Sequence, residues 1–252
     1  MRSSQITNAL VALSVSLLAG TASASTFEAR DVQLTAQQIE AIAPTSNTCD
    51  GAPSPDECAT SEQAALNIAK SFETYEVTSP AEQAAVIGLM AFESGDFKYN
   101  RNHSPGIPGQ GSMCTYRFVL HIAPSLSSPL YSSAQYRKQS LTYTAAPARN
   151  MQSPSFNAQY AASLSGIADQ AVSLAADPAG LLDLLLADEA NDFGSGAWFL
   201  TSQCTPDVRT QLQSGSMDGW ASFISGCVGT EASGDRQAYW QRAVEALGAQ
   251  SA

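Results

Sequence analysis

Hydrophobic residues along the chain recur mainly at the spacing of α-helices, and no run alternates convincingly as a strand would. The clearest helix begins after Ser79, where Pro80 at the first helical position and Glu82 complete the pattern of a capping box. Its sequence, AEQAAVIGLMAFES, has no charged residue between Glu82 and Glu93 and is apolar on all sides. Such a helix is expected to be buried at the centre of a domain.

Further helices are predicted on both sides of this one. Thr60 and Gln63 form a second capping box, which opens a helix that runs through Phe72. One long helix is predicted over SPSFNAQYAASLSGIADQAVSLAA and ends at Pro178, with PAGLLDLLLADEA after it. The pattern indicates a mainly α fold, with its remaining helices around Trp198, Val208 and Trp220 and over Asp235–Leu247, where Trp240, Val244 and Leu247 form a core stripe.

The N-terminus has the pattern of a secretory signal peptide. A lone positive charge precedes a short apolar run and the small-residue triplet that ends at Ala24, where cleavage is expected. We therefore expect a signal peptide over 1–24, an N-terminal extension with a disulfide loop over 25–59 and a catalytic domain over 60–252. The mature protein is expected to be secreted and extracellular.

The net charge limits the possible binding partners, and the cysteine content bears on whether the protein is exported. The net charge of −11 argues against nucleic acid and anionic membranes as partners. Five cysteines are an odd number for an exported protein, and Cys114 lies in an unusual stretch described below. The other four allow three connectivities, of which the neighbour pairs Cys49–Cys58 and Cys204–Cys227 are favoured.

Residues 113–147 differ in composition from the rest of the chain. They contain no Asp or Glu, although the chain has 23, and they hold four of its eight tyrosines. The codons that can encode Ser112 to Cys114, Leu141 to Thr142 and Pro147 to Ala148 can spell a fungal intron donor, branch point and acceptor. We interpret the stretch as a translated intron, whose removal would join Gly111 to Arg149 through one Thr. A genuine surface insertion is the alternative.

Glu93 is the candidate catalytic residue. It ends the apolar helix, where desolvation and the negative end of the helix dipole both disfavour a carboxylate. Both effects raise the pKa, as a general acid requires. The alternative is a helix-terminal Glu that points into water.

Short motifs around Glu93 resemble those of known enzymes. The sequence Glu93-Ser94 with Phe97, then Ser104-Pro105-Gly106, then Met151-Gln152 resembles soluble lytic transglycosylases and goose-type lysozymes, and is similar to secreted fungal muramidases of lysozyme-like fold. The resemblance implies a single lysozyme-like domain with Glu93 as the acid. It also implies a substrate cleft formed by Ser94, Phe97, Gln110, Asn150, Met151, Gln152 and Tyr239.

The sequence departs from that pattern at several points. Phe97 lies one position late, Arg149 and Asn150 replace the usual Gly-Leu, and a third motif has no clear match. Asp96 and Asp235 are candidates for a second carboxylate, although each is more typical of a surface or capping position. His103 is interpreted as a loop side chain, because no metal-ligand spacing surrounds it.

The resemblance implies a monomeric glycosidase, either muramidase or lytic transglycosylase, that cleaves the peptidoglycan glycan strand. No cofactor and no metal are expected. A chitosanase or chitinase of the same fold is an alternative, since the negative charge favours a cationic polysaccharide such as chitosan. A non-catalytic secreted binding protein is a third possibility.

Overall fold

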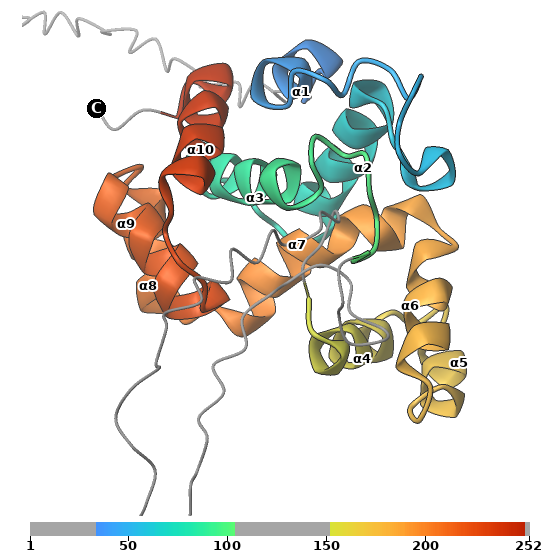
Figure 1. Ribbon diagram of the computed structural model, residues 1–252. Helices are drawn as coiled ribbons and strands as arrows, with labels where there is room; N and C mark the ends of the chain where they lie inside the picture. The colour runs from blue at the N-terminus through green and yellow to red at the C-terminus, as the bar shows by residue number, and fades with distance from the viewer. Residues whose placement is uncertain (1–33, 104–151, 250–252) are drawn as a thin grey trace, which may run out of the picture. The chain divides into compact units, whose positions relative to one another are not determined.

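A computed structural model describes residues 34–103 and 152–249, which are helical and contain no strand (Figure 1). This confirms the predicted mainly α class. None of the helices in these two ranges is both long enough and apolar enough to span a membrane. The elements in chain order are α1 Ala36–Ile42, η1 Pro55–Glu57, α2 Ser61–Thr74, α3 Pro80–Glu93, α4 Pro154–Ser163, α5 Ala168–Ser173, α6 Pro178–Leu186, α7 Glu189–Gln203, α8 Pro206–Gln213, α9 Met217–Ser222, η2 Phe223–Val228 and α10 Gly234–Leu247.

The two predicted capping boxes have different outcomes. Thr60 and Gln63 form theirs reciprocally at the start of α2, as predicted. At α3 the helix begins at Pro80, but Ser79 makes no side-chain capping bond. The predicted box is wrong because Glu82 is buried and pairs with Arg209 of α8, whose Nε lies 2.7 Å from Glu82 Oε1.

The long helix predicted before Pro178 is two helices. The chain leaves helical geometry after Ser163 and resumes it at Ala168. Ser165 and Gly166 lie in this break, and both are weak helix formers, so the helix is interrupted there. The helical spacing of apolar residues nevertheless continues on both sides of the turn. Helix α1 was not among the predicted helices, and it packs on α2 and α10.

Helix α3 is buried, as its apolar sequence predicts. It packs most extensively against α10, and it also contacts α1, α7 and α8 (Figure 1). The closest approach is at Gly88, where a β-carbon would lie 2.9 Å from the backbone Cα of Trp240. A side chain larger than hydrogen at this position would push the two helices apart.

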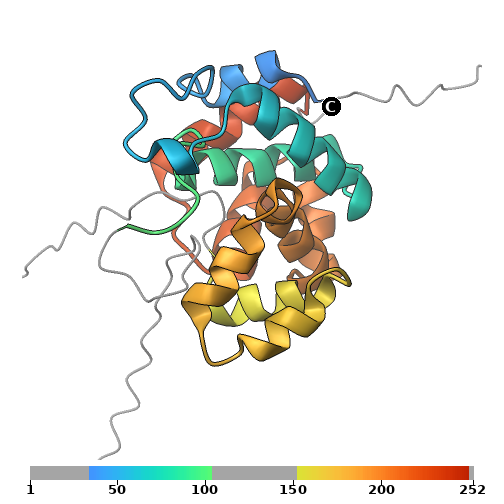
Figure 2. The same ribbon diagram turned by 90° about the vertical axis from the view of Figure 1, so that its right-hand side faces the viewer.

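The remaining helices enclose the core around α3. Helix α2 lies along α7, and α4 packs on both α5 and α6 (Figure 2). Trp240 of the predicted core stripe stacks on Trp220, with ring centroids 5.2 Å apart, while Val244 and Leu247 are partly buried against the core. Trp198 is also buried, so all three tryptophans are core residues, as expected.

Both predicted disulfides are present. Cys49 bonds to Cys58 with 5.8 Å between the Cα atoms, and Cys204 bonds to Cys227 with 5.3 Å. The first closes the loop before α2, and the second ties the end of α7 to η2. Cys114, the stretch 113–147 and the signal peptide 1–24 lie outside the described residues.

Candidate functional site

Glu93 and Arg236 form a buried ion pair between α3 and α10. Glu93 is the last residue of α3 and only 4% exposed. Its Oε1 accepts a hydrogen bond from Arg236 Nε at 2.8 Å and lies 2.7 Å from Nη2 of the same guanidinium. The other oxygen, Oε2, accepts no hydrogen bond from residues 34–103 or 152–249. Arg236 thus fixes one of the two carboxyl oxygens.

Burial and the ion pair have opposite effects on the pKa of Glu93. Desolvation is the larger effect and raises the pKa above its usual value, and the positive charge of Arg236 offsets part of this rise. The Arg236 guanidinium also has other partners. That guanidinium lies 4.9 Å above the Phe92 ring and also donates to the carbonyl oxygen of Glu231 at 3.3 Å. Burial thus favours the protonated form of this carboxyl group.

The chain turns sharply after Glu93 through three residues in left-handed backbone conformation. Gly95, Asp96 and Phe97 have φ angles of 56°, 60° and 64°. For the two residues other than glycine, this conformation costs about 1–2 kcal/mol each. Ser94 supports the turn, because its Oγ donates to the carbonyl oxygen of Met90 at 2.7 Å and accepts from the backbone N–H of Phe97 at 2.8 Å.

Phe97 anchors this turn in the core. Its side chain is fully buried and its ring centroid lies 6.0 Å from that of Phe193. Ser94 and Phe97, which the resemblance placed in a substrate cleft, thus make contacts that stabilise the turn after α3.

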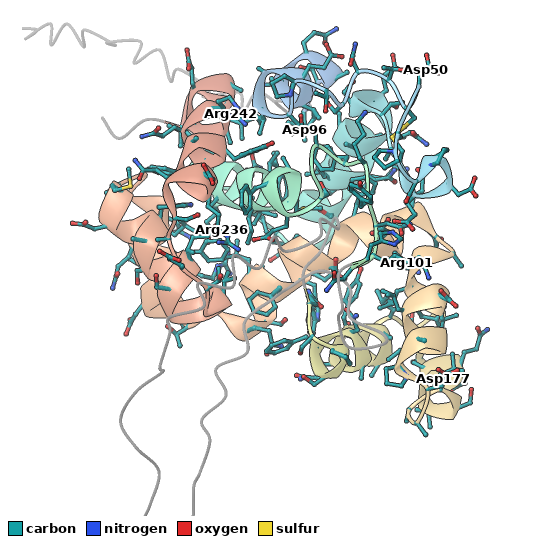
Figure 3. The ribbon with its side chains drawn as sticks, in the orientation of Figure 1. Asp50, Asp96, Arg101, Asp177, Arg236 and Arg242 are labelled. Atoms are coloured by element: carbon teal, nitrogen blue, oxygen red, sulfur yellow. A yellow bond between two sulfur atoms is a disulfide. The ribbon has the colours of Figure 1, made fainter. Side chains whose placement is uncertain are left out.

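Asp96 links this turn to α10 and to the loop after α1. Its Oδ1 accepts from the Tyr239 hydroxyl at 2.7 Å, and its Oδ2 accepts from the backbone N–H and the hydroxyl of Thr45 at 3.0 and 2.8 Å. Burial, followed by the interaction with Asp96, raises the pKa of Tyr239 to about 12. Figure 3 labels Asp96 and the two arginines of α10, Arg236 and Arg242.

These contacts alter the predicted roles of several residues. Tyr239 was expected beside the acid, but its hydroxyl donates to Asp96 instead, and its ring packs edge-on against Phe92 at 5.6 Å. Asp96 accepts three hydrogen bonds and is a structural carboxylate rather than a free second one. Asp235 is exposed in the first turn of α10, as expected for a surface residue.

Gln152 is the one residue of the predicted Met-Gln segment that the structure describes. It is 1% exposed, and its Nε2 donates to the carbonyl oxygen of Ser195 in α7 at 2.8 Å. Its Oε1 is buried and has no hydrogen-bond partner among residues 34–103 and 152–249. Gln110, Asn150 and Met151 lie outside the described residues.

The described residues include no cluster of metal-ligating side chains. His103 is exposed, and its Nε2 lies 2.8 Å from Glu57 Oε1, so this nitrogen is already engaged by a carboxylate. The four described cysteines are paired in disulfides. Across residues 34–103 and 152–249, no group of three or more His, Cys, Asp and Glu side chains is arranged to hold a metal ion.

Arg236 is the site residue that the sequence analysis missed. It lies 143 positions from Glu93, so no local motif connects the two. A signal was nevertheless present, because Arg236 and Tyr239 are three positions apart and share one face of the last helix. A buried carboxyl on α3 needs a partner of opposite charge, and this face could supply it.

One curated relative matches much of the chain. A bifunctional dioxygenase (DOX)–epoxy alcohol synthase (EAS) from Fusarium oxysporum (strain Fo5176) is 38% identical over 193 residues, which cover 74% of this chain and 12% of the relative. The chain thus spans about an eighth of the length of that protein. No family model matches the chain, and no solved structure matches it.

This similarity overturns the resemblance to muramidases. The relative is a dioxygenase–epoxy alcohol synthase, so the prediction of a glycoside hydrolase that acts on peptidoglycan, chitosan or chitin was wrong. The motif around Glu93 has a structural explanation instead. Ser94 and Phe97 stabilise the turn that ends α3, and the sequence that follows is rich in Asn, Pro and Gly, residue types typical of turns.

Proposed function

We propose that this chain is a redox-neutral acid–base domain that acts on an epoxy alcohol, with Glu93 as the proton donor. The observation that carries the proposal is the buried Glu93 carboxyl, which has one oxygen held by Arg236 and the other without a partner among the described residues. The substrate class comes from the name of the relative, an epoxy alcohol synthase.

The proposed reaction is the opening of the epoxide ring by water. Glu93 Oε2 gives its proton to the epoxide oxygen as one carbon–oxygen bond breaks. A water molecule forms the new bond to that carbon, and the proton it loses returns to the Glu93 carboxylate. Epoxide and water yield a diol, and no electrons are gained or lost.

Arg236 has two roles in this proposal. Before proton transfer it fixes the position of the carboxyl group through Oε1, and we propose that Oε2 meets the ligand. After transfer it stabilises the carboxylate that has formed, because its guanidinium lies 2.7 Å from the same oxygen. The guanidinium therefore lowers the cost of giving up the proton, while burial keeps the pKa of Glu93 above its usual value.

The test is the conversion of a short-chain 2,3-epoxy alcohol by the purified protein in ¹⁸O-labelled water. We expect one labelled oxygen in the product and faster turnover at mildly acidic pH, where Glu93 is protonated. Glu93→Gln cannot donate a proton and is expected to lose about 10²- to 10⁴-fold in rate. Glu73→Gln, an exposed acid on α2, is the matched control and should retain the full rate.

Circular dichroism of each variant checks that the helices are intact. If a folded wild-type protein leaves the epoxide unchanged, the proposed activity is wrong. Equal rates for the wild type and Glu93→Gln would exclude Glu93 as the acid.

Export and partners are also proposals. We propose that the chain is secreted after cleavage at Ala24, because of the N-terminal pattern, and that it acts as a monomer without nucleic-acid or membrane partners. Mass determination of the protein recovered from culture medium would test the cleavage.

A further inference from the structure

Phe92, the residue before Glu93 in α3, contacts two side chains of α10. The Arg236 guanidinium lies over its ring, with 4.9 Å between Cζ and the ring centroid. The Tyr239 ring makes a T-shaped contact with it, at 5.6 Å between the centroids and 72° between the planes. Arg236 and Tyr239 are three positions apart on one face of α10. Phe92 thus contacts both residues of this face.

Tyr239 is itself held in place by neighbouring groups. Its hydroxyl donates to Asp96 Oδ1 at 2.7 Å. The Arg242 guanidinium lies over the Tyr239 ring at 4.1 Å, and Arg242 Nε donates to the carbonyl oxygen of Ile42 at 2.8 Å. The Tyr239 ring is therefore fixed through both its hydroxyl and its face, and it gives Phe92 a firm support.

The bonds between Arg236 and Glu93 depend on where the guanidinium lies. Arg236 Nε and Nη2 approach the same oxygen, Oε1 of Glu93, at 2.8 and 2.7 Å. Arginine has a long side chain with many rotamers, and its planar guanidinium stacks well on aromatic faces. Beyond Glu93, the hydrogen bond from Nη1 to the carbonyl oxygen of Glu231 is long, at 3.3 Å. Contact with an aromatic ring is thus the remaining restraint on the guanidinium among its described contacts.

We propose that Phe92 is a positioning residue that acts through Arg236, because its ring holds the guanidinium where Nε and Nη2 reach Glu93. The charge of Arg236 lowers the pKa of Glu93 against the larger effect of burial. A guanidinium that moves more freely would lower this pKa less. The consequence for catalysis rests on the proposed function, whereas the position of the guanidinium does not.

The test is a pH titration of the Glu93 carboxyl carbon by ¹³C NMR in the full chain, with Glu93→Gln to identify the signal. Phe92→Leu keeps an apolar side chain but has no aromatic face. We expect its Glu93 midpoint to rise by about half a pH unit, the size of a cation–π contact near the surface. Phe92→Tyr keeps the ring and should titrate like the wild type.

Two controls separate this role from general effects of losing an aromatic ring. Arg236→Gln removes the charge and should itself raise the Glu93 midpoint. In that background Phe92→Leu should cause no further rise, because the group through which it acts is gone. Phe156→Leu on α4 removes a T-shaped contact with Phe199 at 5.1 Å, away from the ion pair, and should leave the Glu93 midpoint unchanged.

The inference is wrong if Phe92→Leu does not raise the midpoint, if Phe92→Tyr raises it equally, or if Phe92→Leu has its full effect in the Arg236→Gln background. None of these titrations uses a substrate. A raised midpoint in Phe92→Leu, together with a wild type that leaves the epoxide unchanged, would support this inference and contradict the proposed function.

Discussion

At the scale of single residues, the proton on Glu93 links the site to stability. The folded protein raises the pKa of this carboxyl above its value in the unfolded chain, mainly through burial. The folded state therefore binds the proton more tightly than the unfolded state does. By linkage, this contribution to stability is fully present below the unfolded pKa and is lost as the pH rises through the folded pKa.

We therefore expect Glu93→Gln to remove this loss of stability. From about pH 4 upward, the free energy of unfolding of the wild type should decline relative to that of the variant. Urea titrations of both proteins at several pH values give the difference. A difference that stays constant with pH, or grows in favour of the wild type, would show that Arg236 outweighs burial.

The sequence predicted one half of this residue pair. An apolar helix that ends in Glu93 is a local pattern, and it correctly indicated a buried carboxyl. The partner could not be found in the same way, because Arg236 approaches only when α10 packs on α3. The bond from Tyr239 to Asp96 was missed for the same reason, since it depends on a left-handed turn that the sequence does not specify except at Gly95.

At the scale of elements, the packing of α3 on α10 depends on Gly88. A β-carbon there would lie 2.9 Å from Cα and 3.0 Å from N of Trp240, and neither backbone atom can move away alone. We expect Gly88→Ala to destabilise the protein by about 1–3 kcal/mol through overpacking, despite the better helix propensity of alanine. Gly166→Ala is the control, because a β-carbon there meets no atom within 4 Å.

Chemical denaturation of both variants measures the two effects. The expected result is a lower midpoint for Gly88→Ala and little change for Gly166→Ala. Should Gly88→Ala be as stable as the wild type, the close contact between the two helices would be in doubt.

Helix positions were more predictable than helix ends. The capping box of Thr60 and Gln63 formed because both residues lie within one helical turn, and the Gln63 side chain keeps it while its Nε2 also donates to Glu189. The box at Ser79 failed because Glu82 is pulled toward Arg209, 127 positions away. The break between α4 and α5 was missed because apolar spacing records the buried face and not the continuity of the backbone.

At the scale of the whole molecule, the interpretation of residues 113–147 as a translated intron can be tested directly. Replacing residues 112–148 by one Thr shortens the connection between His103 and Gln152 from 48 residues to 12. Because the length falls fourfold, the entropic cost of closing this connection falls by about 1.2 kcal/mol. We expect the shortened protein to keep both disulfides and to melt at the same or a higher temperature.

Peptide mapping without reduction shows whether both disulfides are kept, and a thermal melt gives the melting temperature of the shortened protein. A shortened chain that is unfolded, or that melts well below the full chain, would mean that the stretch is a genuine part of the fold. Sequencing of the transcript across Gly111 and Arg149 is an independent check on the gene.

The contact between α3 and α10 also suits this chain to division into two fragments. Helices α1 to α3 precede residue 104, and α4 to α10 follow residue 151. Each part keeps its own disulfide, and the two are joined by the packing of α3 on α10 and of α2 on α7. Glu93 and Arg236 come from opposite parts. Glu93 and Arg236 would therefore meet only when two separately made fragments associate. The protonation state of Glu93 would then show whether the two fragments have associated.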